Sequence, residues 1–378
     1  MVTKLIFTIE RVIEKKILPF FCYLLSFLKK KKPLLQDNKT IVILRFWGLG
    51  ESILTLPMIK ALKEARPNSK ITVLCTKRNE GVFYSQSFVD SYNVISSLSI
   101  PFLILTNFKK YDLVIDSEPH FAISAIIAFF LGKRSIGFDY GTRSKLYDIN
   151  VHYNDKQHVV YTFCDLLSPL GIITKPNGLV RLKYDENAKN AISFQFEANS
   201  IKLGKKLLIG MHAFCGPTAP WRAWPKERFA ELIDRIKQKY DCMVILTGSG
   251  AEAVGNKEII SMLKNHQEVY AFSNLSPTTL FYLIEKYDLM VSNDTGPMHV
   301  AAAQGVPTIG FFGPETPVRF GPFPPDRNVA LYHKVHDPPL INVHLNKVGK
   351  CDGECLRRIT VDEAFETVNR FMQQKRRG

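Results

Sequence analysis

The residues with the clearest capacity for chemistry form the stretch NDTGPMH, residues 293–299, between an apolar run and a helix-like pattern. Backbone N–H groups at the start of a helix bind phosphate, and the helix dipole favours the anion. Thr295 adds a hydroxyl donor, Gly296 lets a ligand approach the backbone, and His299 lies one turn further along. Because aspartate also caps helices well, both capping and ligand binding are open roles for Asp294.

Alternating strands and helices must position this stretch. Apolar runs predict strands at 41–44, 71–74, 113–115, 207–211, 243–246, 289–292 and 308–312, with helices at 52–65, 121–131, 226–240, 298–304 and 361–372. Such alternation is typical of parallel α/β sheets, whose ligands bind beyond the carboxyl ends of the strands. Residues 293–299 follow a strand in this way, whereas Trp224 is expected in the core.

The pattern predicts two Rossmann-like domains joined by a linker. We expect an N-terminal domain over 37–190, a linker over 191–206, a C-terminal domain over 207–345, and a tail with a closing helix over 346–378, after a separate basic segment at 1–36. A chain of 378 residues with 46% hydrophobic residues has room for two such domains.

The formal net charge of +15 leaves nucleic acid, an anionic membrane and an anionic substrate open as partners. Seven cysteines, an odd number at mostly long spacings, do not suggest a secreted disulfide framework, so we expect a reducing cytosol.

The first 36 residues combine an apolar run with lysines. Residues 17–28 read ILPFFCYLLSFL, which is shorter than the roughly 20 residues that span a bilayer, and no cleavage site follows. Four lysines, 29–32, come next, and each basic residue near an anionic bilayer contributes about 1 kcal/mol. We predict that residues 1–36 contact an anionic membrane surface. A packed helix followed by a solvated charge run is the alternative.

Four separated stretches resemble the signature of glycosyltransferase family 9, the heptosyltransferases. They read IVILRFWGLGESILTLPMIKALKEARPNSKITVL, YDLVIDSEPH through RSIGFDYGTRSKLYDI, WRAWP with ERFAEL, and SNDTGPMHVAAAQGVPTIGFFGPETPVRFGPF, in the expected order over roughly residues 40–370. The resemblance implies a GT-B fold, in which two Rossmann-like parallel-sheet domains face a cleft. It also implies an inverting, metal-independent transfer, with the acceptor on the N-terminal domain and the donor mainly on the C-terminal one.

The resemblance also implies roles for individual residues. Glu51 stands where the family usually has Asp, the general base that deprotonates the acceptor hydroxyl. Arg222 would bind the donor pyrophosphate, Glu252 the ribose hydroxyls, and Thr218 a phosphate. The other donor-binding residues would be Asp294, Thr295, Gly296 and His299. For Glu51 a carboxylate that only favours the helix start is the alternative, and for Arg222 it is a surface salt bridge.

These roles predict transfer of a heptose from ADP-heptose to a lipid-linked glycan, the inner core of a lipopolysaccharide. The enzyme would be cytoplasmic and peripheral on the inner face of the inner membrane, with no cofactor besides the nucleotide sugar and no metal. Cys351 and Cys355 form a CxxxC pair. Two ligands fall short of the four of a structural metal site, so whether this pair, with His336 and His344 nearby, binds metal stays open.

Three alternatives differ in class. A dinucleotide-dependent oxidoreductase would use Gly48 and Gly50, but the third glycine and the later acidic residue of that fingerprint are missing. A basic nucleic-acid- or membrane-binding protein without catalysis would explain the charge. The basic residues, however, cluster beside aromatics rather than on a groove-binding motif, so no nucleic acid is expected. A glycosyltransferase with another nucleotide sugar or acceptor polymer stays open, because the fold does not specify the sugar.

Overall fold

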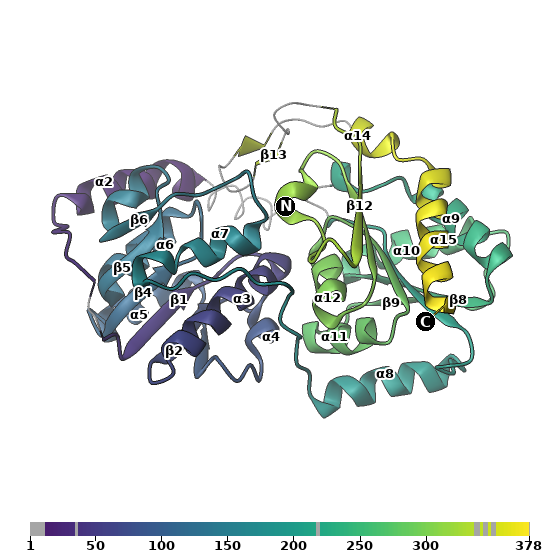
Figure 1. Cartoon of the computed structure of the whole chain (residues 1–378), viewed down its shortest axis with the longest axis horizontal. Coiled ribbons are helices and arrows are strands. Elements are labelled where there is room, and N and C mark those ends of the chain that lie inside the picture. Colours follow the sequence, from purple (N-terminus) through teal and green to yellow (C-terminus); the bar gives the residue numbers. More distant parts are fainter. Residues whose placement is uncertain are drawn as a thin grey trace. The chain divides into compact units, whose positions relative to one another are not determined.

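The structure, a computed structural model, describes residues 12–34, 37–216, 220–335, 341–342, 347–348 and 353–377. The chain folds into two compact α/β units with a boundary after Pro176: unit 1 precedes it and unit 2 begins at Asn177. Figure 1 draws unit 1 in purple through blue to teal and unit 2 in teal through green to yellow. Each unit is described by itself.

Unit 1 contains a six-stranded parallel sheet in the order β3-β2-β1-β4-β5-β6. Its strands are β1 (Thr40–Leu44), β2 (Lys70–Cys75), β3 (Ser91–Val94), β4 (Tyr111–Asp116), β5 (Gly132–Phe138) and β6 (Ile149–Val151). The central strand, TIVIL, is buried along almost its whole length, as expected for a parallel strand covered on both faces. Because β1 lies between β2 and β4, the strand order reverses there, which is where ligands of such sheets bind.

Helices cover the sheet of unit 1. They are η1 (Ile13–Ile17), α2 (Leu18–Ser26), α3 (Leu49–Ala65), α4 (Glu80–Phe83), α5 (Ile100–Thr106), α6 (Ala122–Leu131) and α7 (Val159–Asp165), with short turns η2 (Ser97–Ser99), η3 (Thr142–Leu146) and η4 (Ser168–Leu170). Residues of α2 and α6 share one core cluster with β1, β2 and β4, and residues of α5 pack against it.

Unit 2 repeats this architecture, with the order β12-β11-β10-β7-β8-β9 and every pair parallel. Its strands are β7 (Leu207–His212), β8 (Cys242–Gly248), β9 (Val269–Ser273), β10 (Leu289–Asn293), β11 (Thr308–Phe312) and β12 (Asn328–Tyr332). The order reverses at β7, between β10 and β8. The two sheets confirm the predicted α/β class with two Rossmann-like domains.

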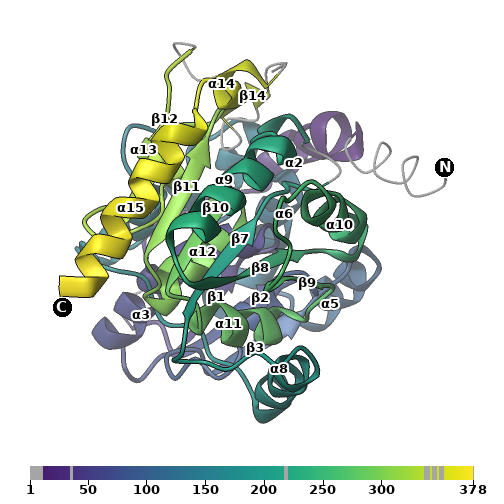
Figure 2. The same cartoon turned by 90° about the vertical axis from the view of Figure 1, so that its right-hand side faces the viewer.

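The helical elements of unit 2 are α8 (Glu186–Ala198), η5 (Pro220–Arg222), α9 (Lys226–Lys239), η6 (Gly250–Glu252), α10 (Ala253–Ser261), α11 (Pro277–Glu285), α12 (Gly296–Gln304), α13 (Pro317–Phe320), α14 (Glu354–Arg357) and α15 (Val361–Arg377). A two-stranded ribbon pairs β13 (Ile341–Asn342) with β14 (Lys347–Val348). Figure 2 shows α15 against the sheet of unit 2, where it packs on α9.

Trp224 lies in the core of unit 2, as predicted. Its ring centroid is 5.1 Å from that of Phe229 and 4.5 Å from that of Phe311. The indole Nε1 donates a hydrogen bond of 2.9 Å to the carbonyl of Ile359. The residue therefore ties β11 and α9 to the chain that leads into α15.

The predicted linker, 191–206, differs from the structure. Helix α8 extends through Ala198, and the boundary of the compact units lies earlier, after Pro176. The Asp185 side chain accepts a hydrogen bond from Ala188 N and caps the helix, while Ile192 and Phe196 bury its inner face. A polar, lysine-bearing sequence thus forms a helix because only a narrow stripe of it needs to be apolar.

The described part of the N-terminal segment packs on unit 1. Cys22 is fully buried, and Leu18 and Leu25 lie against the same core cluster. Lys29 Nζ forms a 2.7 Å ion pair with buried Asp148. Residues 12–34 therefore belong to unit 1 rather than to a separate segment, as the packed-helix alternative expects. Among the described helices, none is long and apolar enough to cross a membrane.

Candidate functional site

Glu51 lies at the carboxyl edge of the sheet of unit 1. Helix α3 begins at Leu49, soon after β1 ends, and Glu51 stands in its first turn, where the helix dipole favours a carboxylate. The turn before it depends on Gly48, whose φ of +73° is strained for residues with a side chain. A Cβ at Gly48 would also lie 3.2 Å from the Glu51 carboxylate. The predicted base thus follows a turn that only glycine fits well.

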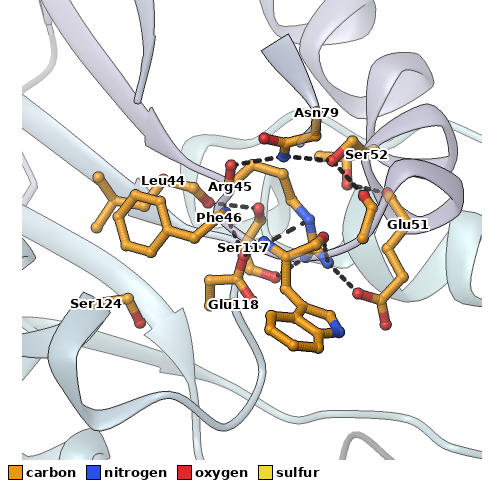
Figure 3. Close-up of polar contacts among 12 residues, drawn as sticks. Leu44, Arg45, Phe46, Glu51, Ser52, Asn79, Ser117, Glu118 and Ser124 are labelled. Atoms are coloured by element: carbon orange, nitrogen blue, oxygen red, sulfur yellow. Dashed lines mark hydrogen bonds and ion pairs between the residues drawn. The ribbon is translucent and has the colours of Figure 1, made fainter. Parts of the chain in front are cut away.

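Arg45, which is buried, forms an ion pair with the Glu51 carboxylate. Its Nη2 lies 2.5 Å from Glu51 Oε2, and the Arg45 side chain is completely buried (Figure 3). Nη1 donates to the Ser117 carbonyl at 2.9 Å, and Nη2 also donates to the Trp47 carbonyl at 3.1 Å. Because these contacts fix the guanidinium, they also fix the direction of the carboxylate bound to it.

Glu118 is a second carboxylate beside Arg45, which sequence reasoning missed. Its Oε1 accepts hydrogen bonds from the backbone N–H groups of Phe46, at 2.5 Å, and Trp47, at 3.0 Å (Figure 3). Arg45 Nε lies 3.7 Å from the same oxygen. Burial raises the pKa of Glu118 to about 7; Arg45 opposes that rise, and Glu51 adds to it. Glu118 therefore changes protonation near neutral pH.

Two polar side chains attach the turn to the end of β1. Asn79 Nδ2 donates to the Arg45 carbonyl at 3.0 Å and to Ser52 Oγ at 2.7 Å. Ser52 Oγ in turn donates to the Gly48 carbonyl at 2.7 Å (Figure 3). Both side chains are fully buried, so the turn that carries Glu51 is held rigidly.

Arg222 and Asp294 meet at the carboxyl edge of unit 2. Asp294 directly follows β10, and Arg222 ends η5, in the segment between β7 and α9. Arg222 Nη2 donates to Asp294 Oδ2 in a very short hydrogen bond and to the Asp294 carbonyl at 3.2 Å. The Asp294 carboxylate raises the pKa of Arg222 further, against burial. Arg222 Nε is buried and has no hydrogen-bond partner among the described residues.

Helix α12 begins beside this pair without a side-chain cap. Thr295 is the N-cap residue, and no side-chain hydrogen bond from the described residues caps the helix. Thr295 Oγ1 donates to the Asn293 carbonyl at 3.2 Å, while the Asp294 carboxylate binds Arg222. Of the two roles open for Asp294, capping is therefore not the one seen. Gly296 is the first helical residue, and His299 is buried one turn inside.

Glu252 lies after β8, at the same edge. Its Oε2 accepts hydrogen bonds from Ser249 N at 2.8 Å and Ser249 Oγ at 2.9 Å, and its Oε1 accepts one from Gly216 N at 2.8 Å. Burial opposes ionisation, but these donors and the charge of nearby His212 outweigh it and lower the pKa of Glu252. Each carboxylate oxygen has a second lone pair, so the group can still accept from a ligand.

His212 ends β7 and is buried. Its Nδ1 lies 3.1 Å from Thr247 Oγ1, and burial lowers the pKa of the imidazole. The imidazole is therefore a buried group with Thr247 as its hydrogen-bond partner. Thr218 lies outside the described residues, so the structure does not place it.

Glu315 is another carboxylate that sequence reasoning missed. It follows β11, and its Oε1 accepts a hydrogen bond of 3.0 Å from Arg319 Nε. Burial raises the pKa of Glu315 to about 7, with Arg319 opposing and Asp294 adding to the rise. The GPET sequence directly after a predicted strand was the available signal.

Metal ligands do not gather in the described part of the chain, where no group of three or more His, Cys, Asp or Glu residues is placed to hold an ion. Cys355 is buried, while Cys351, His336 and His344 lie outside the described residues. Whether the CxxxC pair binds a metal thus stays open.

The two edges offer different chemistry. Unit 1 presents a carboxylate, Glu51, which can accept a proton. Unit 2 brings together Arg222, Asp294, Thr295, Gly296 and Glu252, with His299 inside the helix. A guanidinium with a spare N–H beside the open start of a helix suits a phosphate or diphosphate. The described candidate residues therefore lie at the carboxyl edges of the two sheets, and their roles stay predictions.

Known proteins share this architecture. Lipopolysaccharide heptosyltransferase 1 of Campylobacter coli is 24% identical over 295 residues, which cover 72% of this chain and 83% of that protein. A glycosyl transferase family 9 structure from Veillonella parvula superposes with a TM-score of 0.76 at 21% identity, over 90% of this chain and 99% of the other. The ADP-heptose lps heptosyltransferase II of E. coli gives 0.70 at 19% identity, over 89% and 99%. These structures confirm the GT-B fold class.

A family comparison covers more than half of the chain. The description of glycosyltransferase family 9 (heptosyltransferase) matches residues 107–346, which include β4 to β12 and every candidate residue of unit 2. The carboxylate of unit 1, Glu51, lies before the matched range. The chain therefore belongs to glycosyltransferase family 9, the heptosyltransferases, and is a glycosyltransferase.

Proposed function

We propose that this enzyme transfers a heptose from ADP-heptose to the inner core of a lipopolysaccharide, with inversion at the anomeric carbon. The observation that carries the proposal is the Arg222–Asp294 pair at the open N-terminus of α12, an arrangement suited to a diphosphate. The donor named for the similar E. coli structure and the acceptor named for the Campylobacter coli relative support the two substrates.

The proposed reaction is a single displacement. The acceptor hydroxyl oxygen forms a bond to the anomeric carbon of the heptose as the bond from that carbon to the ADP oxygen breaks. Glu51 takes the hydroxyl proton, and ADP leaves with the bonding electron pair. Arg45 keeps the Glu51 carboxylate directed through their ion pair.

The leaving diphosphate gains negative charge as the bond breaks. In the proposal, Arg222 and the N-terminus of α12 stabilise this charge, Thr295 adds a hydroxyl donor, and Gly296 permits close approach to the backbone. His299 and Thr218 are assigned to the same anion. Glu252 would accept hydrogen bonds from the ribose hydroxyls. No metal step is included, because the cation and the helix dipole supply the counter-charge.

We also propose that the enzyme works on the cytoplasmic face of the inner membrane, as a peripheral protein. The exposed apolar and basic residues of the described N-terminal segment support this location. The enzyme and a lipid-linked acceptor would then lie on the same membrane surface, so the enzyme would not have to find the acceptor by diffusion from solution.

The first test is a calorimetric titration of the purified chain with ADP, UDP, GDP, CMP and NAD, each with and without EDTA. Selective binding of ADP that EDTA does not change is the expected result. Preference for UDP or GDP would replace the donor and keep the fold and mechanism. Binding of NAD alone, or of none of them, would overturn the proposal.

The second test follows the product. The enzyme is incubated with ADP-heptose and a lipid A–inner core acceptor, and mass spectrometry measures the acceptor. The expected result is a mass gain of one heptose, with the new linkage inverted by NMR. ADP binding without transfer to this acceptor would keep the donor and replace the acceptor polymer.

A further inference from the structure

The outer face of α2 is apolar and exposed. Phe20 and Leu24 of α2, with Ile17 and Phe27 at its two caps, recur at helical spacing; the exposed fractions of Ile17, Phe20, Leu24 and Phe27 are 51%, 61%, 46% and 71%. The opposite face of the same helix packs on the core of unit 1. This helix is therefore held in place by one face while the other presents large apolar side chains to the surroundings.

A second helix of unit 1, α5, also has one exposed apolar face and one face that packs on the core. Leu98, Phe102, Leu105 and Phe108 follow each other at spacings of four, three and three along η2, α5 and the following turn. Their exposed fractions are 93%, 70%, 80% and 60%. The other face of α5 packs through Ile100 and Leu103 against the core cluster that holds α2.

The two exposed faces meet at the end of α6. Lys29 follows α2 and Lys109 follows α5, and both ammonium groups lie over the ring of Phe129, at 5.9 Å and 4.7 Å from its centroid. The Phe108 ring lies 6.3 Å from that of Phe130, the next residue of α6. Figure 2 shows α2, α5 and α6 on one side of unit 1. One cluster of rings thus connects the two faces.

The two segments that carry these faces have charges of one sign. Residues 17–34 and 94–111 contain six lysines and no acidic residue. Lys30, Lys31, Lys32 and Lys110 are exposed. An apolar surface bordered by exposed ammonium groups complements a bilayer with anionic headgroups, because the rings enter the interface while the lysines meet phosphate.

We propose that these residues form one membrane-docking surface, the α2–α5 surface, which binds an anionic bilayer. It consists of Ile17, Phe20, Phe21, Leu24, Phe27, Leu28, Leu98, Phe102, Leu105 and Phe108 with Lys30, Lys31, Lys32 and Lys110. This goes beyond the proposed location because it adds α5, which lies far from the N-terminal segment in the sequence, as a second insertion point. It rests on the proposed function only in that a lipid-linked acceptor needs such a surface.

A second copy of the chain is the competing occupant. A two-fold contact would bring the surface against itself, and the lysines of one copy would then face those of the other. Like charges brought together in this way weaken association. The charge pattern therefore favours the bilayer.

The test measures sedimentation of the full chain with phosphatidylcholine vesicles and with vesicles that also contain phosphatidylglycerol. Binding to the anionic vesicles that falls as salt rises is expected. Phe102→Glu and, separately, Leu105→Glu should each reduce that binding at least about tenfold, since a charge replaces an inserting apolar group. Equal binding by wild type and both variants would overturn the role of α5.

The matched control is Phe194→Glu on α8, because Phe194 is 68% exposed against 70% for Phe102. For charge, the double variant Lys30→Glu with Lys31→Glu is compared with Lys202→Glu and Lys205→Glu, an exposed pair in unit 2. Controls that bind as wild type, with unchanged thermal melting of all variants, support the proposal. Loss of binding in the controls to the same degree would show general charge repulsion and overturn it.

Sedimentation equilibrium of the same proteins tests the competing occupant. A wild-type dimer that Phe102→Glu dissociates would assign the surface to a second copy and overturn membrane docking. ADP titration and transfer to a detergent-dispersed acceptor are measured in parallel. Because these need no vesicle, loss of vesicle binding with both retained separates failure at this surface from failure of the proposed function.

Discussion

An ion pair between an arginine and a carboxylate lies at the carboxyl edge of each sheet. The carboxylate is the more exposed partner in unit 1, and the arginine is the more exposed partner in unit 2. In unit 1 the Arg45 side chain is completely buried and its partner Glu51 is 16% exposed. In unit 2 the acidic partner, Asp294, is 9% exposed and Arg222 is 25% exposed. The pair of unit 1 follows β1, where the strand order reverses. The pair of unit 2 joins the segments that follow β7, where the order reverses, and its neighbour β10.

In each pair the more buried partner positions the more exposed one, and the two units differ in which residue type is more exposed. Unit 1 buries a cation and presents a carboxylate, which suits proton acceptance. Unit 2 holds a guanidinium with a carboxylate and presents the cation beside a helix N-terminus, which suits a diphosphate. The outward partner is therefore the one to which substrate chemistry is assigned.

The largest expected effect is the loss of turnover when Glu51, the more exposed partner in unit 1, is replaced. Glu51→Gln keeps the size and one acceptor oxygen but removes the base, so kcat should fall about 10²–10⁴-fold while ADP affinity stays within about twofold. Rapid-quench turnover and calorimetry measure the two quantities. Glu64→Gln, at an exposed position on the same helix, is the control. Near-normal turnover of Glu51→Gln would remove the base from this residue.

Arg222 should give the next largest effect. Arg222→Lys keeps the charge but loses the planar fork, so it cannot hold Asp294 and a phosphate together. We expect kcat to fall about 10²-fold and the Kd for ADP to rise about tenfold. Arg235→Lys, in an exposed pair with Asp362, controls for the substitution. If Arg222→Lys leaves both constants unchanged, unit 2 does not use this cation for the diphosphate.

The inner carboxylate of unit 1 predicts a pH effect on stability. The folded-state pKa of Glu118, about 7, lies above its ordinary value of 4.5, so the folded chain binds more protons between these values. Its contribution is therefore complete below about pH 4.5 and is lost as pH rises through about 7. Glu118→Gln should flatten the fall in melting temperature over this range.

Other glutamates of the chain serve as comparisons for the pH effect of Glu118. Glu14 and Glu315 also have pKa values raised to about 7, so the slope should shrink in Glu118→Gln and not vanish. Glu64→Gln should leave the melting profile as in wild type. A profile of Glu118→Gln that matches wild type would mean that Glu118 is already ionised in the folded chain.

The smallest effect is expected at Glu252. Glu252→Gln loses one carboxylate acceptor, and ADP affinity should fall about threefold to tenfold. With 2′-deoxy-ADP or 3′-deoxy-ADP the same substitution should have less effect, since one ribose hydroxyl is already missing. If affinity falls equally for all three nucleotides, Glu252 acts by holding its loop through Ser249 and Gly216 and does not contact the ribose.

The sequence predicted the strands that run through the centre of each sheet. The runs at 41–44, 207–211 and 308–312 match β1, β7 and β11, because a parallel strand buried on both faces is continuously apolar. Edge strands β3 and β6, SYNV and INV, were missed because half-exposed short strands carry little apolar pattern. The linker was placed too late because α8 is polar on most of its surface.

The candidate site was predictable where motifs are local. Glu51, Arg222, Glu252 and Asp294 each follow a predicted strand, and the structure places them at carboxyl edges. Their partners were not predictable in the same way. Arg45 directly follows β1, and nothing in the local sequence indicates that it is buried. Its second carboxylate, Glu118, lies just after β4, which only the fold brings beside β1.

The burial of Lys29 against Asp148 has a consequence for the order of synthesis. The helix that precedes Lys29 packs on α6 and η3, which lie about a hundred residues later in the chain. At a ribosomal rate of about 5–20 residues per second, α2 waits roughly 6–24 s for the residue that pairs with Lys29. During that interval the inner face of α2 is without its tertiary partners, so a nascent chain presents both faces of this helix to its surroundings before unit 1 can form.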